Sequence, residues 1–356
     1  MIILSILGAR SQFIKAAAVS REIAKHNEIT EIIVHTGQHF DKNMSEIFFQ
    51  QMQIPKPDYN LEINSLSHVA MTGKMLEKIE KVLIKEKPDW VLVFGDTNST
   101  IAGALAAKKL HIKVAHVEAG LRSYNRNMPE EINRVLTDRI SDVLFCPTEI
   151  AVQNLIAEGF DNSECEIVKS GDVMLDAALF YSELSQKPNF EVPDKFILST
   201  IHRAENTDNL YRLSSILKAF EKISTEIPII LPLHPRTRKI INNLKFEIEN
   251  SNLRIVVPVG YLEMIWLLQN CSLVMTDSGG MQKEAFFFKK PCVTLRDETE
   301  WVELVDNFYN IVAGADSNII YSSYLEMKNK SLLFDEKFYG TGNASKIIIR
   351  ELLKKS

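Results

Sequence analysis

Short apolar runs alternate with helical patterns from one end of the chain to the other. The runs are rich in Ile, Val and Leu, which is typical of strands buried on both faces of a parallel sheet. Between them lie helical patterns such as residues 76–86, where Leu76, Ile79, Val82 and Leu83 share one face. The pattern therefore predicts repeated βα units. The predicted strands are 2–7, 31–35, 90–94, 113–117, 143–146, 166–170, 196–200, 228–233, 254–257, 272–276, 292–295 and 310–313.

Half of these runs precede Gly171 and half follow it. This division predicts an α/β fold of two Rossmann-like, doubly wound domains with a cleft between them. We place the N-terminal domain at residues 1–170 and the C-terminal domain at residues 171–340. The last helical pattern, at about 341–356, carries apolar residues at 347–349 and 352–353 and is predicted to pack back on the first domain.

Polar and charged signatures follow the apolar runs where each predicted strand ends. In open parallel sheets, ligands bind beyond the carboxyl ends of the strands, so these loops are expected to converge on one cleft. Loops without a task are more often plain turns of Gly, Pro, Asn and Ser. The loops that carry Arg, His, Asp, Glu or paired glycines are 8–12, 36–39, 95–99, 118–122, 201–206, 234–236 and 277–280.

The loop 277–280 has the sequence of an anion site. Gly279 and Gly280 allow the backbone to approach a bulky anion, and a helix that begins beside them directs free N–H groups at it. The predicted ligand is a diphosphate held at Ser278, Gly279 and Gly280; the alternative is a simple helix cap made by Ser278 or Asp277. Glu284, one turn later, can accept both hydroxyls of a ribose, or can interact only with the helix dipole.

Positive and donor groups follow several of the strands. Arg10 directly follows the first strand, where a guanidinium can grip phosphate oxygens in a bidentate manner. Lys15 lies about one helical turn later and is either a ligand contact or a solvated lysine. His202 and His234 end equivalent strands of the second half, which favours a role in binding over a purely structural role. Arg236 follows His234 in the same loop.

Four carboxylates are candidate proton carriers. Asp96 and Glu118 end consecutive strands, so pairing of those strands would bring them close. Glu130 and Glu131 lie in the first turn of a helix that begins at Pro129; there they could instead serve the helix dipole alone. Two carboxylates in one cleft shift each other's pKa, which allows one to act as base and the other as acid.

Composition narrows the classes of function. The chain has 356 residues, with 41 basic and 46 acidic side chains and a net charge of -5. No basic stripe offsets that balance, so no nucleic-acid partner is expected. The N-terminal apolar run reaches Arg10 and is typical of a strand rather than a signal peptide. No segment approaches the ~20 apolar residues of a membrane span.

The cysteine spacing and the glycine motifs carry further expectations. Cys146, Cys165, Cys271 and Cys292 lack CxxC or His-paired spacing, which predicts reduced thiols, no metal and a cytoplasmic location. The chain has neither a P-loop nor a GxGxxG motif that would indicate ATP or NAD. We therefore expect no cofactor.

Taken together, these motifs resemble the non-hydrolysing UDP-N-acetylglucosamine 2-epimerases. The resemblance covers nearly the whole chain, and so many matches in the same order are highly specific. The matching segments are GARSQFIK (8–15), HTGQH (35–39), GDTNST (95–100), HVEAGLRS (116–123), MPEEINR (128–134), HRAEN (202–206), HPRTR (234–238) and DSGGMQKEA (277–285).

The resemblance implies a glycosyltransferase-B-like fold with the active site between the domains, no redox cofactor, and a homodimer. Such enzymes remove the C2 proton of a UDP-2-acetamido sugar, expel UDP to leave a 2-acetamidoglycal, and add UDP back with protonation on the opposite face. It implies that the catalytic residues are Asp96, Glu118 and Glu130, with His202 assisting at the diphosphate. The implied substrate-binding residues are Arg10, Lys15, Arg122, Arg134, His234, Ser278, Gly279, Gly280 and Glu284.

The chain also departs from the commonest family pattern. Ser11 stands where a proline is usual, and Trp301 stands in TEWVE (299–303) where many UDP-GlcNAc epimerases carry TERPE. Segments 261–269, 283–292 and 299–305 look closer to a subgroup that epimerises UDP-2,3-diacetamido-2,3-dideoxyglucuronate for surface polysaccharide such as lipopolysaccharide O-antigen. That substrate has an extra carboxylate, for which Arg122, Arg126 and Arg296 are candidate partners.

Other readings of the same motifs remain open. Plain UDP-N-acetylglucosamine is the alternative substrate. A UDP-sugar glycosyltransferase is a more distant alternative, because that reaction uses the same architecture and nucleotide site. A hydrolysing epimerase and a silent nucleotide-sugar sensor would share the same nucleotide site.

Overall fold

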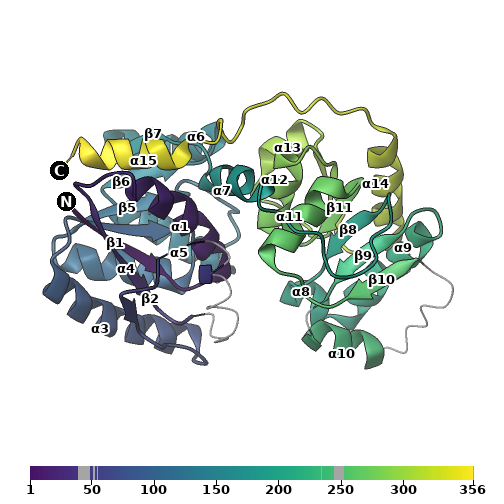
Figure 1. Ribbon diagram of the computed structural model, residues 1–356, viewed down its shortest axis with the longest axis horizontal. Helices are drawn as coiled ribbons and strands as arrows, with labels where there is room; N and C mark the ends of the chain where they lie inside the picture. The colour runs from purple at the N-terminus through teal and green to yellow at the C-terminus, as the bar shows by residue number, and fades with distance from the viewer. Residues whose placement is uncertain (39–48, 51–52, 54, 234, 244–251, 356) are drawn as a thin grey trace. The chain divides into compact units, whose positions relative to one another are not determined.

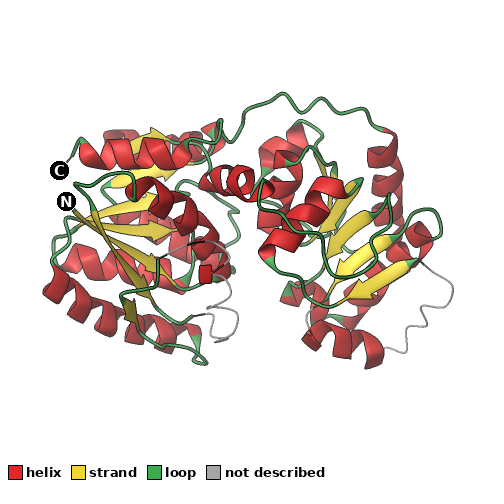
Figure 2. Ribbon diagram, in the orientation of Figure 1, coloured by secondary structure: helices red, strands yellow, loops and turns green. Residues whose placement is uncertain are grey.

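The computed structural model describes residues 1–38, 49–50, 53, 55–233, 235–243 and 252–355. The chain forms two compact units. Unit 1 comprises Met1–Leu179 and Lys337–Ser356, and unit 2 comprises Phe180–Glu336. Each unit has a parallel sheet with helices interleaved along the chain (Figure 2). These two sheets confirm the predicted α/β class with doubly wound units.

The sheet of unit 1 has seven parallel strands in the order β3-β2-β1-β4-β5-β6-β7. The central strands are apolar on both faces; all five residues of the strand Trp90–Phe94 are buried. The short edge strand Tyr59–Asn60 was not predicted, because its two residues carry no apolar run. The strands of unit 1 are β1 (Ile2–Leu7), β2 (Thr30–His35), β3 (Tyr59–Asn60), β4 (Trp90–Phe94), β5 (Lys113–Val117), β6 (Val143–Cys146) and β7 (Glu166–Lys169).

Helices follow the strands of unit 1 and cover its sheet (Figure 1). They are α1 (Arg10–Ile23), α3 (His68–Glu86), α4 (Asn98–Lys109), α5 (Pro129–Ile140), α6 (Glu149–Ala157), the 3-10 helix η1 (Phe160–Asn162), α7 (Val173–Ser182) and α15 (Ala344–Leu353). Helix α4 packs between α3 and α5, while α15 packs beside α1. The apolar face of α3 around Met75 and Ile79 forms one core with Leu4 and Val93 of the sheet, as its helical spacing predicts.

Unit 2 repeats this architecture with six parallel strands in the order β10-β9-β8-β11-β12-β13. The strands are β8 (Ile197–Thr200), β9 (Ile229–Pro232), β10 (Leu253–Val256), β11 (Leu273–Thr276), β12 (Cys292–Thr294) and β13 (Asn310–Val312). The helices are α8 (Ala204–Thr207), α9 (Leu210–Ser224), α10 (Pro235–Asn243), α11 (Tyr261–Asn270), α12 (Gly279–Phe287), α13 (Val302–Asp306) and α14 (Ser317–Asn329). One core lies against α9 and α14 and another against α11 and α12.

The strand order of each sheet reverses once, between β1 and β4 in unit 1 and between β8 and β11 in unit 2. At such a switch point the loops after the two strands diverge to opposite faces and leave a crevice for ligands. The loops that follow these strands contain Gly8, Gly95, His202 and Asp277. Four of the loops singled out in the sequence, 8–12, 95–99, 201–206 and 277–280, therefore follow the strands at the two switch points.

The division between the units falls at Leu179 and Phe180, inside α7, rather than at the predicted residue 170. The first turns of α7 are bonded to unit 1, because the N–H of Asp172 donates to the carbonyl of Tyr339, and the carboxylate of Asp176 accepts the N–H groups of Ala344 and Ser345. Unit 2 ends at Glu336 rather than at residue 340. Helix α15 belongs to unit 1.

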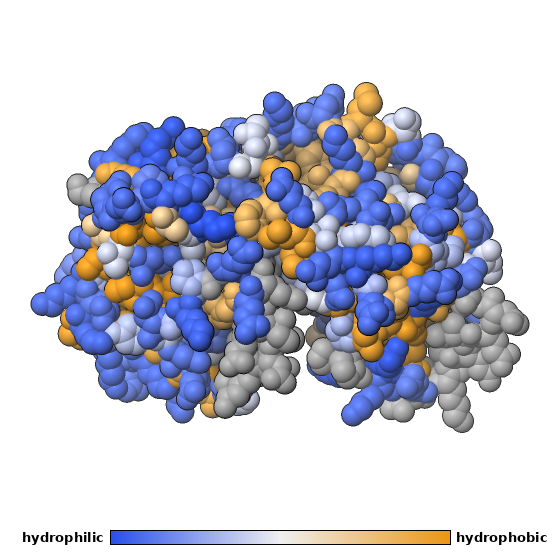
Figure 3. Space-filling view, in the orientation of Figure 1, coloured by the Kyte–Doolittle hydropathy of each residue, from blue (hydrophilic) through white to orange (hydrophobic). Residues whose placement is uncertain are grey.

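The surface and the cysteines agree with an ordinary globular chain. The visible face of each unit carries mostly hydrophilic residues, with apolar residues in small groups (Figure 3). No helix within the described ranges combines the length and apolar character that a membrane crossing requires.

All four cysteines are free thiols. Burial raises the pKa of the Cys271 thiol to about 12, which leaves it protonated and unreactive at neutral pH.

Candidate active site

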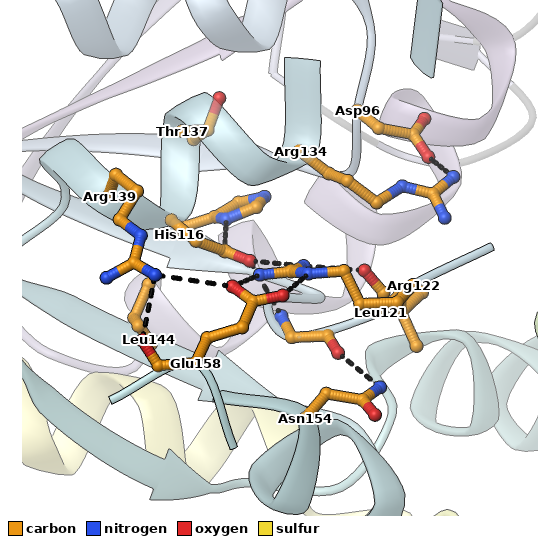
Figure 4. Close-up of polar contacts among 12 residues, drawn as sticks. Asp96, His116, Leu121, Arg122, Arg134, Thr137, Arg139, Leu144, Asn154 and Glu158 are labelled. Carbon is orange, nitrogen blue, oxygen red and sulfur yellow. Dashed lines mark hydrogen bonds and ion pairs between the residues drawn. The ribbon is translucent and has the colours of Figure 1, made fainter. Parts of the chain in front are cut away.

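Asp96 follows strand β4 and is paired with a cation from helix α5. Its carboxylate accepts a hydrogen bond from the Arg134 guanidinium (Figure 4). Arg134 is nearly buried, and its Nη1 atom lies 3.2 Å from a carboxylate oxygen of Glu131. The side-chain amide of Asn133 donates to the backbone carbonyl of Asp96 at 2.9 Å. Helix α5 therefore fixes both the backbone and the side chain of Asp96, whose side chain is 29% exposed.

Glu118 follows the neighbouring strand β5 and has a left-handed backbone, with φ of 72°. Residues other than glycine rarely adopt this conformation, and it is often found at functional sites. The carbonyl of Phe145 accepts the N–H groups of both Glu118 and Ala119 at 3.1 Å, which holds the turn. The side chain of Glu118 forms a buried ion pair with Lys15 of α1.

Gly95 lies close to the Lys15–Glu118 pair and immediately precedes Asp96 in the chain. Its φ of 61° lies in the left-handed region that glycine adopts without strain. A Cβ atom at this position would lie 2.9 Å from Nζ of Lys15 and 3.2 Å from Oε2 of Glu118. The structure thus brings Asp96, Glu118, Lys15 and Arg134 together at the carboxyl ends of two adjacent strands.

The two glutamates at the start of α5 differ in their surroundings. Glu130 is half-buried in the first turn. Glu131 is buried, and its carboxylate accepts the N–H groups of Ser123 and Tyr124 at 2.9 Å. Its oxygens therefore close the preceding loop, which favours a structural role for Glu131.

Arg122, one of the predicted substrate contacts, is paired with protein carboxylates. Its side chain is 1% exposed, and its donors are taken up by protein acceptors (Figure 4). It makes a bidentate pair with Glu158 at 2.6 and 2.9 Å, and its Nη1 atom donates to Asp138 at 2.7 Å and to the carbonyl of Leu121 at 2.6 Å. Burial alone would lower the pKa of the guanidinium, but the hydrogen bonds and charges of Glu158 and Asp138 raise it. Arg122 is part of the scaffold beneath the site.

In unit 2, His202 follows strand β8 and is held by a buried carboxylate. Its Nδ1 atom lies 2.9 Å from Oδ1 of Asp277, while its side chain is 56% exposed. Asp277 also accepts the N–H groups of His202 and Arg203 and the amide of Asn206. Burial would raise the pKa of Asp277, but His202 and these N–H groups outweigh it and lower the pKa. The sequence suggested Asp277 only as a helix cap, so its contact with His202 was missed.

The N-terminus of α12 is capped by Ser278, and the space beside Gly280 is open. Ser278 is the N-cap residue, and its hydroxyl accepts the N–H of Met281 at 3.4 Å. The side chain of Ser278 therefore caps the helix, which is the alternative that the sequence left open. Gly279 and Gly280 have no left-handed backbone that would require glycine. A Cβ atom on Gly280 would meet no atom within 4 Å. Space is therefore left beside the first N–H groups of the helix, where an anion is stabilised.

Buried polar residues surround this helix terminus. A Cβ atom on Gly279 would lie 3.6 Å from Nε1 of Trp301, 3.8 Å from Oε2 of Glu300 and 3.9 Å from Nη1 of Arg296. Arg296 is 2% exposed and pairs with Glu300 at 2.9 Å. Burial would lower the pKa of Arg296, but Glu300 raises it. Trp301, which departs from the family pattern, thus lies directly against the predicted diphosphate site.

Glu284, on the second turn of α12, is buried, and its Oε1 atom accepts the hydroxyl of Tyr261 at 2.8 Å. Tyr261 was not among the predicted site residues; it lies in an apolar helix pattern that conceals its polar contact. The side chain of Arg10 and all of His234, both predicted to contact the substrate, fall outside the described residues. Among the described residues, no group of three or more His, Cys, Asp or Glu is arranged to hold a metal ion.

A family model for UDP-N-acetylglucosamine 2-epimerase matches residues 21–353 of the chain. The chain belongs to the UDP-N-acetylglucosamine 2-epimerase family. It is 56% identical to the UDP-2,3-diacetamido-2,3-dideoxy-D-glucuronate 2-epimerase of Pseudomonas aeruginosa, over 99% of this chain and 100% of that protein. It is 46% identical to the UDP-N-acetylglucosamine 2-epimerase of Methanocaldococcus jannaschii, over 98% of this chain and 97% of that protein.

Solved structures of the UDP-N-acetylglucosamine 2-epimerase family agree with this membership. The Methanocaldococcus jannaschii UDP-GlcNAc 2-epimerase in complex with UDP-GlcNAc and UDP superposes with a TM-score of 0.91 at 45% identity, covering 99% of this chain and 100% of that chain. The Neisseria meningitidis enzyme bound to UDP-GlcNAc superposes with a TM-score of 0.89 at 33% identity, covering 99% and 100%. The predicted family, the glycosyltransferase-B-like fold class and the enzyme class, an isomerase, are thereby confirmed.

Proposed function

We propose that the chain is a non-hydrolysing UDP-sugar 2-epimerase that interconverts UDP-2,3-diacetamido-2,3-dideoxy-D-glucuronate and its manno epimer. The observation that carries the proposal is the pair of carboxylate–cation contacts at the ends of β4 and β5. Asp96 with Arg134, and Glu118 with Lys15, place two potential proton carriers on adjacent loops. Inversion without net oxidation requires proton transfer on both faces of C2, and one carboxylate alone would return the proton to the side it came from.

The reaction proceeds by elimination and re-addition. A carboxylate base takes the C2 proton, the C–H electron pair forms the C1–C2 double bond, and the C1–O bond breaks with its pair leaving on UDP. Protonation of C2 from the other face and attack of the diphosphate oxygen on C1 complete the inversion. The C2–H bond is weakly acidic, so stabilisation of the departing diphosphate is needed at the same time.

The proposal assigns proton transfer to Asp96, Glu118 and Glu130 and UDP binding to unit 2. The open N-terminus of α12 at Gly279 and Gly280 supplies N–H groups for the diphosphate. His202 presents its exposed ring toward solvent while Asp277 holds its Nδ1 atom, and we assign it to the departing diphosphate. Glu284 is assigned to the ribose, with Tyr261 holding one of its oxygens.

The choice of sugar rests on two features of the chain. The identity to the diacetamido-glucuronate enzyme of Pseudomonas aeruginosa, 56%, exceeds the identity to the UDP-N-acetylglucosamine 2-epimerase of Methanocaldococcus jannaschii, 46%. Trp301 also replaces the arginine that many UDP-GlcNAc enzymes carry beside the nucleotide site. Arg122 is committed to Glu158 and Asp138, and Arg296 is buried in its pair with Glu300. The candidate partner for the extra substrate carboxylate is therefore the exposed Arg126. The alternative substrate remains UDP-N-acetylglucosamine.

One NMR experiment tests the reaction and the substrate. Each UDP-sugar is incubated with the protein in D2O, and C2–H is followed over time. We expect deuterium at C2 and an equilibrium mixture of epimers, faster with the diacetamido-glucuronate than with UDP-GlcNAc. Exchange with UDP-GlcNAc alone would support the alternative substrate. Accumulation of free sugar and UDP would indicate hydrolysis, and a complete lack of exchange at C2 would reject epimerase activity.

Three further expectations accompany this function. We infer that the enzyme is a homodimer, acts in the cytoplasm, and supplies sugar for a surface polysaccharide such as lipopolysaccharide O-antigen. Light scattering of the purified chain tests the first: a mass of twice 40.5 kDa is expected, and a monomer mass would reject the dimer.

A further inference from the structure

A buried carboxylate on α5 is connected to the backbone of the Asp96 loop. Oδ1 of Asp138 lies 2.7 Å from Nδ1 of His116, and Nε2 of the same ring lies 2.7 Å from the carbonyl oxygen of Gly95. Gly95 immediately precedes Asp96 in the chain. The side chains of His116 and Asp138 are both 0% exposed. A continuous chain of hydrogen bonds therefore runs from Asp138 to the backbone that carries Asp96 (Figure 4 shows the His116 ring within this network).

The same carboxylate is bonded to the loop that carries Glu118. Oδ2 of Asp138 accepts the N–H of Gly120 at 3.2 Å and Nη1 of Arg122 at 2.7 Å. Both donors lie within four residues of Glu118 along the chain. Arg122 is in turn held by its bidentate pair with Glu158. One side chain thus ties together the loops after β4 and β5.

The hydrogen-bond partners determine the charge of His116. A backbone carbonyl can only accept, so Nε2 must donate to Gly95. Oδ2 of Asp138 accepts from the Arg122 guanidinium and from the N–H of Gly120, which favours the carboxylate form, and a carboxylate also only accepts. Burial would raise the pKa of Asp138, but the hydrogen bonds and charges of His116 and Arg122 lower it. Donation to both partners requires a proton on each ring nitrogen of His116. The result is a row of alternating charges that runs from the buried His116, Asp138 and Arg122 to the partly exposed Glu158. Each buried charge has a partner, as burial requires.

We propose that Asp138 and His116 are positioning residues for proton transfer at C2, because they hold the two loops from which Asp96 and Glu118 extend. The inference rests on the proposed epimerase function and adds residues that touch neither UDP nor the sugar. A displacement of about 1 Å at a reacting group can cost on the order of 100-fold in rate. Loosening either loop should therefore reduce the chemical step rather than the binding of the nucleotide.

The kinetic test uses Asp138→Asn and His116→Gln, with Asp142→Asn as a matched control. Asp142 accepts the N–H of Val114 at 2.7 Å and pairs with Lys108 at 2.8 Å, so it holds the opposite end of β5. At a temperature where circular dichroism shows each protein folded, both network variants should lower kcat on the order of 100-fold with KM and UDP affinity unchanged. Asp142→Asn should keep the wild-type kcat even if its melting temperature falls.

A second measurement examines the wild-type protein directly. In a sample with 15N-labelled histidine, the resonances absent from His116→Gln belong to His116. We expect protons on both of its ring nitrogens at neutral pH, and one of them to be lost in Asp138→Asn. A single protonated nitrogen in the wild type would overturn the inference. So would wild-type kcat in Asp138→Asn or His116→Gln, or failure of both to fold while Asp142→Asn folds. If the wild type itself epimerised neither UDP-sugar, the proposed function would fail, while the NMR result would still decide the charge of His116.

Discussion

Nδ1 of His202 lies 2.9 Å from Oδ1 of Asp277, and the two residues follow adjacent strands, β8 and β11, at the switch point of unit 2. The buried carboxylate fixes the ring, because Nδ1 must donate to it, and this leaves Nε2 as the nitrogen that can meet a ligand. An aspartate that orients a histidine in this way sets its tautomer and stabilises its protonated form. Asp277 therefore controls which nitrogen of His202 is left for a ligand, which under the proposed function is the departing diphosphate.

The first prediction concerns Asp277→Asn. Asparagine removes the negative charge beside the ring, so a proton that Nε2 would donate to the departing diphosphate is no longer stabilised on it. We expect kcat to fall at least ~100-fold, the scale of a lost acid–base group. Steady-state kinetics on protein shown to be folded by circular dichroism measure this effect.

The matched control for that variant is Asp297→Asn. Asp297 lies in the same unit and pairs with Arg212 at 2.9 Å, but its side chain is 70% exposed. This change should leave kcat at the wild-type value. Equal activity of folded Asp277→Asn and Asp297→Asn would exclude a role of Asp277 in orienting His202.

The second prediction concerns Asp96→Asn. Asparagine keeps the size of the side chain and an acceptor for Arg134, but it cannot take a proton. We expect turnover and deuterium incorporation at C2 to fall at least ~100-fold, while UDP affinity measured by calorimetry stays unchanged, since the nucleotide contacts are assigned to unit 2. Exchange at C2 at the wild-type rate would remove Asp96 from the mechanism.

The fold could be predicted because its signals are local. Each predicted strand is an apolar run, and the order of strands in a doubly wound sheet follows from short right-handed connections. Strand β3 could not be found in this way, because Tyr59 and Asn60 pair through their backbone with β2 and show no pattern in their side chains. The local pattern also cannot show that the start of α7 is bonded to residues around 340, since the N–H of Asp172 donates to the carbonyl of Tyr339.

The sequence indicates which loops carry charged residues, but it does not indicate how those residues pair. A charged residue after a strand looks the same in sequence whether it faces a ligand or other residues of the protein. Arg122 contacts Asp138 and Glu158, and no local pattern shows this. Lys15 and Glu118 meet across 103 positions of sequence, which no local pattern reveals. His116 lies inside the apolar strand β5. A histidine in such a strand indicates a buried polar partner, which here is Asp138.

The third prediction is the pH dependence of the stability that Asp138 provides. Its pKa in the folded protein is lowered from the ordinary value of 3.8. A group with a depressed folded pKa stabilises the native state above its unfolded pKa, and loses that contribution as the pH falls through its folded pKa. Asp138→Asn should therefore lower the free energy of unfolding by about 3–5 kcal/mol at neutral pH, as for a buried charge left without its partner. Below pH 3.8 the difference from wild type should shrink.

Urea unfolding followed at a series of pH values measures that difference. The comparison with Asp142→Asn is informative, because that carboxylate is about one-third exposed and should contribute much less. A difference between wild type and Asp138→Asn that stayed constant through the acid range would mean that the carboxylate is not stabilised by His116 and Arg122.

The fourth prediction separates binding from stability at the N-terminus of α12. Gly280 has neither a left-handed backbone nor neighbours that a Cβ atom would meet, so nothing in the protein requires glycine there. Alanine in its place should stabilise the helix by up to about 1 kcal/mol. The added methyl group would occupy the space beside the free N–H groups, and crowding of this kind costs about 1–3 kcal/mol. UDP affinity should therefore fall about 10-fold while the melting temperature stays the same or rises.

Gly73→Ala is the control that isolates the helix effect. Gly73 lies in α3 of unit 1, also with open space around the position of a Cβ atom, and gains the same propensity without approaching the predicted nucleotide site. Calorimetric titration with UDP and thermal unfolding of both variants should show equal or higher stability in each, and weaker UDP binding only in Gly280→Ala. Because the two substitutions are chemically identical, unchanged UDP affinity in Gly280→Ala would mean that the diphosphate does not lie against this helix terminus, and the glycines of the motif would need another explanation.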